Sequence, residues 1–181
     1  MIYALIIVGI LAVLLGLIAL GLHLKGRTLP IEHTSFAVIR LDRNAPEVWA
    51  VIADAARQPE WQKSVTKVDR LPDRNGHTVW KQSMGRNSFT LEETIVEPPR
   101  RLVREIVDNK GPFSGSWEFL LIPIPASEGN QAVKVRLTER GKVTSTIPRA
   151  IMHFFGEDMY LKKYLTALAA KMGEGAKFSN D

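Results

Sequence analysis

The sequence predicts one transmembrane helix followed by an α+β domain, in which a seven-stranded antiparallel sheet precedes a long C-terminal helix. Three observations support this prediction. Residues 2–22 form an unbroken apolar run. In short segments between residues 34 and 140 apolar side chains alternate with polar ones, which is the period of strands. From residue 146 to residue 172 they recur at the period of an amphipathic helix.

The apolar run has the length and composition of a membrane span. Residues 2–22 contain no charged side chain, and as a helix they extend roughly 31 Å, close to the ~30 Å hydrocarbon core of a bilayer. A cleavable signal peptide, the alternative, has a basic segment before a shorter apolar run and a small-residue cleavage site after it. Neither feature is present around residues 2–22. We therefore expect an uncleaved, single-pass anchor.

The distribution of charged residues predicts the orientation of this anchor in the membrane and argues against one class of partner. Lys25 and Arg27 follow the run, so the positive-inside rule predicts a bacterial inner-membrane protein with its domain in the cytoplasm. The excess of positive charge is small, and a periplasmic domain stays open. The net charge is +5 and there is no cysteine, which excludes disulfides and thiolate chemistry. Because Lys and Arg are scattered among Asp and Glu, we expect no nucleic-acid partner. The oligomeric state is not determined by these features.

Along the chain we expect four segments. Residues 1–24 form the anchor, residues 25–32 a juxtamembrane linker, residues 33–173 a single domain and residues 174–181 a C-terminal tail. The domain has the length of one ordinary folding unit and is long enough to bury a core.

The domain begins with a strand at 34–42. Asn44 can cap the following helix, with Pro46 suited to its first turn, and a second short helix starts at 59–61. Turn signals separate the other strands, which favours an antiparallel meander. These strands are expected at 65–71, 78–84, 88–97, 101–107, 116–122 and 132–140. One long helix then covers residues 146–172.

Several short motifs occur in order along the domain. A helix with the sequence Ala45-Pro46-Glu47-Val48-Trp49-Ala50-Val51-Ile52-Ala53-Asp54 precedes Pro59-Glu60-Trp61. Further matches lie at 96–102, 115–119 and 138–141. In this order the motifs resemble the SRPBCC superfamily, also called START-like, and within it the polyketide cyclase/dehydrase group. The resemblance covers the whole domain and not the anchor.

The resemblance implies a helix-grip fold, in which a curved antiparallel sheet wraps around the long C-terminal helix. It also implies a cavity between sheet and helix, where members of the superfamily commonly hold lipids, sterols, polyketides or other apolar ligands. The superfamily also contains enzymes, hormone receptors and chaperone regulators, so the fold alone does not choose the function.

The candidate cavity residues lie on three elements, namely the strands at 116–122 and 132–140 and the final helix. Trp117, Phe119 and Leu121 share one strand face, and an apolar stripe runs along the final helix with Asp158 in its middle. Each apolar member could fill the core instead. Asp158 could pair with Lys162 one turn later, or could orient a ligand's hydroxyl or carbonyl. The expected cavity residues are Trp117, Phe119, Leu121, Val135, Ile151, Phe154, Asp158 and Leu161.

Sequence motifs for other chemistry are absent. His33, His77 and His153 have no metal-ligand spacing, and there is no nucleophile elbow, P-loop or dinucleotide fingerprint. We therefore expect no metal and no cofactor, and we assign no catalytic residue. One carboxylate of Glu92 and Glu93 would face inward from a regular strand, which hints at acid–base chemistry.

Three classes of function are compatible with these features. The leading hypothesis is a membrane-anchored, non-catalytic domain that binds a lipid or another hydrophobic small molecule. The alternative is a cyclase or dehydratase acting on a polyketide-like substrate through an inward carboxylate such as Asp158. The third is a protein-binding regulator whose cavity is vestigial.

Overall fold

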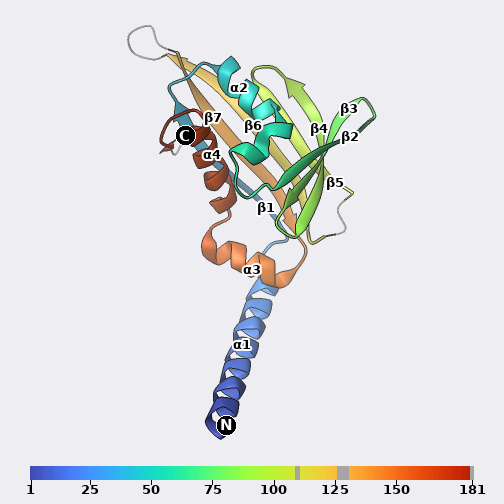
Figure 1. The fold of residues 1–181 in the computed structure, drawn as a ribbon, viewed down its shortest axis with the longest axis vertical. Coiled ribbons are helices and arrows are strands. Elements are labelled where there is room, and N and C mark those ends of the chain that lie inside the picture. The colour runs from blue at the N-terminus through green and yellow to red at the C-terminus, as the bar shows by residue number, and fades with distance from the viewer. Residues whose placement is uncertain (109–110, 126–130, 180–181) are drawn as a thin grey trace.

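A long N-terminal helix leads into a domain of one sheet and several helices (Figure 1). The computed structural model describes residues 1–108, 111–125 and 131–179. Parts of two predicted turns, at 108–115 and 123–130, and the last two residues of the predicted tail lie outside the described residues.

The helices are α1 (Ile2–Thr28), α2 (Ala45–Ala53), the short 3-10 helix η1 (Ala55–Glu60), α3 (Thr146–Phe155) and α4 (Met159–Lys171). The strands are β1 (Glu32–Leu41), β2 (Lys67–Arg74), β3 (His77–Met84), β4 (Asn87–Glu97), β5 (Arg101–Val107), β6 (Phe113–Pro125), β7 (Gln131–Val143) and β8 (Lys177–Ser179).

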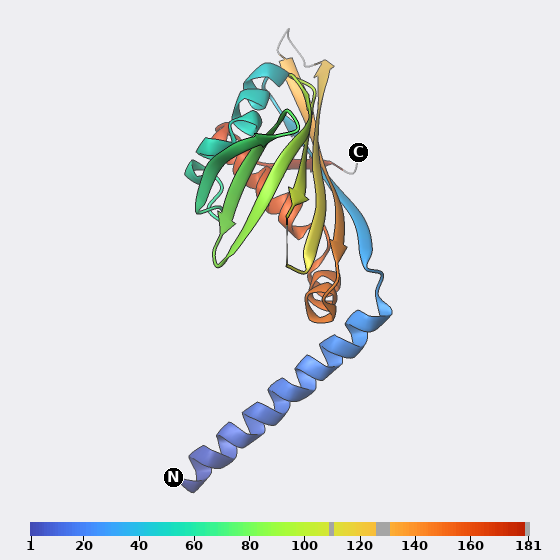
Figure 2. The same ribbon diagram turned by 90° about the vertical axis from the view of Figure 1, so that its right-hand side faces the viewer.

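All strands belong to one antiparallel sheet in the order β2-β3-β4-β5-β6-β7-β1-β8. The sheet curves, and α2, η1 and α4 cover the same face of it (Figure 2). This is the predicted α+β arrangement, in which the sheet grips a C-terminal helix. Within the described residues the sheet has eight strands rather than the predicted seven, because Lys177–Ser179 pairs with β1. A three-residue strand is too short to show a sequence period.

The start of α2 forms as the sequence predicts. The Asn44 side chain accepts a hydrogen bond of 2.9 Å from the backbone N–H of Glu47, which satisfies a donor that the helix itself cannot pair. Val48 and Ile52, one turn apart, are fully buried against the sheet. The motif at 45–54 therefore encodes a capped helix with one apolar face.

The predicted long helix at 146–172 is wrong in one respect, because the structure divides it into α3 and α4. Gly156 ends α3 with φ = 95°, a conformation that glycine adopts without the strain of a side chain. The chain then changes direction, so Asp158 lies at the N-cap of α4 and not in the middle of a continuous stripe.

The core lies between the sheet and the helices α2 and α4. Leu161, Leu165 and Leu168 of α4 are completely buried there. Their partners on the other elements include Ile39, Leu41, Ile52, Leu102, Leu121, Val133, Val135 and Leu137.

Unlike α2 and α4, α1 leaves its apolar side chains exposed. Its most apolar window has a mean hydropathy of 3.1, and none of that window is buried. By length and composition it is suited to crossing a membrane. Only the C-terminal end of α1 packs on the domain, where Gly26 is buried.

Candidate functional site

A cavity of about 240 Å³ lies between the sheet, α3 and the first turn of α4. Most of its wall is apolar and comes from β3, β4, β5, β6, β7, α3 and α4. The apolar lining residues are Met84, Phe89, Ile106, Phe113, Trp117, Val143, Ile151, Met152, Phe155, Met159 and Tyr160. A few polar side chains join them, namely His33, Ser114, Glu139, Lys142 and Glu157. An apolar cavity with few polar groups is typical of a small-molecule site.

The imidazole of His33 has a place in the wall because the neighbouring strand carries glycine. His33 of β1 lies opposite Gly141 of β7, and a Cβ at Gly141 would lie 2.2 Å from Cε1 of the ring. Any other residue at 141 would therefore displace the ring. The glycine thus allows a large polar side chain to lie flat against the sheet.

His33 is the centre of a charged cluster at the cavity. Its Nε2 lies 3.8 Å from Oε1 of Glu139, and the imidazole is almost fully buried. Interaction with Glu139 raises the pKa of His33 against the opposing effect of burial, and the charge of Glu157 raises it further. Glu157 is held near by a hydrogen bond of 3.2 Å from the Ser35 hydroxyl to its backbone carbonyl. The cluster can therefore hold a proton close to an apolar ligand.

The rings of Trp117 and Tyr160 close the inner end of the cavity. Their centroids are 5.7 Å apart, and both also border a second space of about 10 Å³. That volume is near the minimum for one water molecule. The second space is lined by Gln58, Gln82, Leu91, Arg104, Trp117, Phe119, Leu137, Tyr160 and Tyr164.

Several polar side chains border this inner space. Arg104 donates to Glu93 through Nε and Nη2, at 2.9 and 2.8 Å, and to the carbonyl of Ile52 at 3.0 Å. Trp117 Nε1 and the Tyr164 hydroxyl are buried without a hydrogen-bond partner among the described residues. Burial raises the pKa of Tyr160, so its hydroxyl stays protonated. The inner end can therefore donate hydrogen bonds to a polar atom.

Glu92 and Glu93 of β4 both pair with basic side chains. Glu93 receives the Arg104 guanidinium, while Oε1 of Glu92 lies 2.7 Å from Nδ1 of His77. Neither lines the cavity. Among residues 1–108, 111–125 and 131–179, no three His, Cys, Asp or Glu side chains gather as a metal ion would require.

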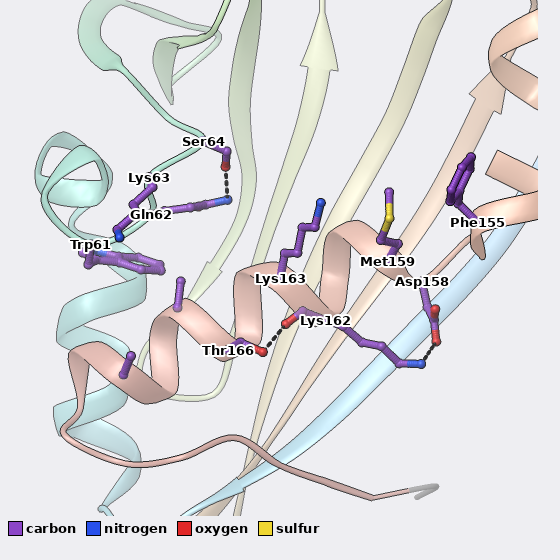
Figure 3. A pocket seen from close by; sticks show the side chains of 12 residues that line it. Trp61, Gln62, Lys63, Ser64, Phe155, Asp158, Met159, Lys162, Lys163 and Thr166 are labelled. Carbon is purple, nitrogen blue, oxygen red and sulfur yellow. Dashed lines mark hydrogen bonds and ion pairs between the residues drawn. The ribbon is translucent and has the colours of Figure 1, made fainter. Parts of the chain in front are cut away.

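An open groove follows the outer side of α4 (Figure 3). Trp61 and Lys63 lie on one side of it, and Asp158 and Lys162 lie on α4. The carboxylate of Asp158 and Nζ of Lys162 are 2.6 Å apart, and both side chains are partly exposed. Phe155 and Met159 border the groove as well as the cavity, so they form the wall between the two.

The structure distributes the eight sequence-predicted cavity residues over five places. Trp117 and Ile151 line the cavity, and Phe119 borders the inner space. Asp158 lies in the outer groove, and Phe154 is exposed to solvent. The remaining three fill the core and do not line the cavity; they are Leu121, Val135 and Leu161.

The physical reason is the direction of β6. This strand begins beside α3, where Phe113 and Trp117 face the cavity. It continues past the inner space at Phe119 and reaches the core at Leu121. Side chains on the same face of β6 therefore border the cavity near the start of the strand and pack against α4 further along it.

The sequence reasoning missed His33, Glu139 and Tyr160. His33 is isolated in the sequence, and only the pairing of β1 with β7 brings it to Glu139 and Gly141. The motif at 138–141 contains Glu139 and Gly141, and it is the signal that could have identified this corner of the site.

A family model described as polyketide cyclase/dehydrase and lipid transport matches residues 33–173. No curated protein matches the chain. Among solved structures, the Zhui aromatase/cyclase from Streptomyces sp. R1128 superposes with a TM-score of 0.66 at 16% identity, over 78% of this chain and 94% of that one.

Two further structures are similar. A START superfamily protein from Mycobacterium smegmatis has a TM-score of 0.65 at 14% identity, over 78% of this chain and 97% of its own. Truncated norcoclaurine synthase from Thalictrum flavum has a TM-score of 0.60 at 10% identity, over 78% and 94%. These likenesses establish the START-like fold that the sequence motifs imply.

Proposed function

Because the chain belongs to the polyketide cyclase/dehydrase and lipid transport family, we propose that it holds a lipid or another hydrophobic small molecule next to a membrane. The cavity between the sheet and α3 is the proposed binding site. The observation that carries the proposal is the composition of its wall, in which eleven apolar or aromatic side chains surround a space of about 240 Å³.

Helix α1 supplies the membrane anchor in this proposal. Its exposed apolar surface extends over a length that suits a bilayer, and the basic residues Lys25 and Arg27 lie in its last turn. By the positive-inside rule the domain would lie on the cytoplasmic side of a bacterial inner membrane. The tether keeps the binding site near the phase in which hydrophobic ligands dissolve.

The size of the cavity restricts the ligand. Pockets for drug-sized ligands have volumes of roughly 300–1,000 Å³, so about 240 Å³ holds a small apolar molecule or one end of a longer chain. The unpaired Nε1 of Trp117 suits a ligand with a hydroxyl or carbonyl at its inner end. A compact amphiphile fulfils both conditions.

Mass spectrometry of molecules that co-purify with the full-length protein tests this proposal. Val143 is buried in the cavity wall, so Val143→Phe fills the cavity. Val96 is exposed on β4, so Val96→Phe makes the same change away from it. We expect one small molecule to be enriched with the wild type and Val96→Phe and lost from Val143→Phe. Equal recovery from all three proteins, each checked by a thermal melt, would contradict the proposal.

One observation favours catalysis as a second candidate function. His33 and Glu139 lie 3.8 Å apart at the wall of an apolar cavity, and histidine and carboxylate side chains are the usual general acids and bases. A cyclase or dehydratase acting on a polyketide-like substrate would use this pair rather than Asp158, which lies in the outer groove.

Incubation with a linear poly-β-ketone separates the two functions. An enzyme converts it to a cyclised or dehydrated product, and His33→Gln abolishes the conversion. A binding protein returns the compound unchanged. A protein-binding regulator with a vestigial cavity would retain no small molecule in either experiment.

A further inference from the structure

The apolar face of α3 lacks cover from the domain. Ile147, Ile151 and Phe154 follow one another at spacings of four and three residues, which places them on one side of the helix. Phe154 is 64% exposed and the adjacent Phe155 is 70% exposed. A contiguous exposed apolar surface on a domain with a complete core marks a site of interaction.

The N-terminal part of α3 is fixed to the end of α1. Gly26 lies against the backbone of Thr146, so closely that a Cβ there would be 2.0 Å from the Thr146 carbonyl oxygen. His23 Nδ1 and the Thr146 hydroxyl are 2.8 Å apart. Arg149 donates a hydrogen bond of 2.9 Å to the carbonyl of Leu29. Figures 1 and 2 both show α3 at the end of the domain that adjoins α1.

This attachment determines the depth of α3 in a membrane. If α1 spans the bilayer with residues 2–22, His23 and Gly26 lie at the level of the head groups, and α3 lies there with them. Amphipathic helices at this level bury their apolar face about 5–10 Å into the boundary with the acyl chains. The adjacent Lys25 and Arg27 complement anionic head groups.

We propose that α3 lies in the head-group layer of the membrane that α1 spans, with Ile147, Ile151 and Phe154 in contact with the acyl chains. This inference rests on the proposed function, because it requires α1 to be a membrane span. Ile151, Met152 and Phe155 of the same helix line the cavity. The cavity therefore borders the bilayer, and its ligand is a membrane-dissolved molecule that passes α3 without crossing bulk water.

Spin labelling tests this placement in the full chain, which has no native cysteine. Single cysteines replace Phe154, Leu11 in the middle of α1, and Thr166 as an exposed control on α4. The labelled proteins are reconstituted into vesicles of phosphatidylcholine and phosphatidylglycerol. Accessibility to oxygen, which concentrates in lipid, is then compared with accessibility to a water-soluble nickel chelate.

We expect the labels at 11 and 154 to be more accessible to oxygen, and the label at 166 to be more accessible to nickel. A lipid-exposed label at 11 with a nickel-accessible label at 154 would overturn this inference alone. A nickel-accessible label at 11 would overturn the membrane anchor of the proposed function and this inference with it. Dipolar broadening at 154 that disappears on dilution with unlabelled protein would identify a second copy as the occupant, and would also overturn it.

A matched pair of glycine variants tests the attachment. Gly26→Ala creates a clash with the Thr146 backbone, whereas Gly21→Ala in the same helix has no atom within 4 Å of its new Cβ. We expect Gly26→Ala to shift the label at 154 toward nickel accessibility and to leave the label at 11 unchanged. Gly21→Ala should change neither label. An unchanged label at 154 in Gly26→Ala would show that its depth does not depend on α1.

Discussion

Helices α3 and α4 follow one another in the chain and continue the same apolar stripe, but they use it differently. The three leucines of α4 are completely buried, whereas Ile147, Ile151 and Phe154 of α3 remain exposed. The sheet packs against α4 to form the core, whereas a cavity remains between the sheet and α3. The difference shows that one sequence pattern can encode both a core helix and a surface helix, depending on the bend between them.

The largest expected effect is at a buried leucine of α4. Leu165→Ala should lower the free energy of unfolding by about 2–5 kcal/mol, because it removes buried methyl groups and leaves a hole. Phe154→Ala on α3 is the matched truncation of an exposed side chain and should change it by less than about 0.5 kcal/mol. Chemical denaturation of the full chain in mild detergent measures both. Similar losses for the two variants would end the distinction between the helices.

The next largest loss of unfolding free energy is expected at the bend between α3 and α4. Gly156→Ala forces a side chain into a backbone conformation with φ = 95°, and such conformations cost about 1–3 kcal/mol for residues other than glycine. Gly175→Ala, where the new Cβ meets nothing within 4 Å, is the control. The same denaturation experiment compares them. A neutral Gly156→Ala would show that the bend does not depend on glycine.

A pH-dependent effect is expected on the cavity side of the molecule. Because the fold raises the pKa of His33 above 6.5, the protonated imidazole stabilises the native state. This contribution is complete below about pH 6.5 and is lost as pH rises through the folded-state pKa. Wild type minus His33→Gln, measured as a difference in unfolding free energy against pH, should therefore decline over that range. A flat difference would remove the coupling of His33 to Glu139.

The smallest change in the free energy of unfolding is expected for the ion pair in the outer groove. Asp158 and Lys162 are partly exposed, and exposed ion pairs of this spacing contribute about 0.3–0.5 kcal/mol. Lys162→Ala should therefore lower the free energy of unfolding by no more than about 0.5 kcal/mol, and less in high salt. A loss of several kcal/mol would mean that the pair supports the core, as a buried pair does.

The sequence was sufficient to predict the order of elements from α1 to β7, the capped α2 and the apolar N-terminal helix. These features depend on local periods and on single capping residues such as Asn44. The division at Gly156 was missed because one glycine leaves a 27-residue apolar stripe almost unchanged, although it redirects the backbone.

The candidate site was harder to predict than the fold. Trp117 and Ile151 line the cavity, but Leu121 has the same orientation on the same strand as Trp117 and lies in the core. The path of α3 and α4 determines whether an inward side chain of the sheet packs in the core or lines the cavity. His33 and Glu139 meet through strand pairing across more than a hundred residues, which no local pattern records.

The cavity beside α3 is the proposed binding site for a hydrophobic molecule. Photolabelling of the full chain in vesicles with a medium-chain fatty acid that carries a diazirine tests this directly, with labelled residues located by mass spectrometry. We expect adducts on cavity side chains such as Met84, Phe113 and Met152, which Val143→Phe removes and Val96→Phe retains. Adducts confined to α1 and the exposed face of α3, identical in all three proteins, would contradict it.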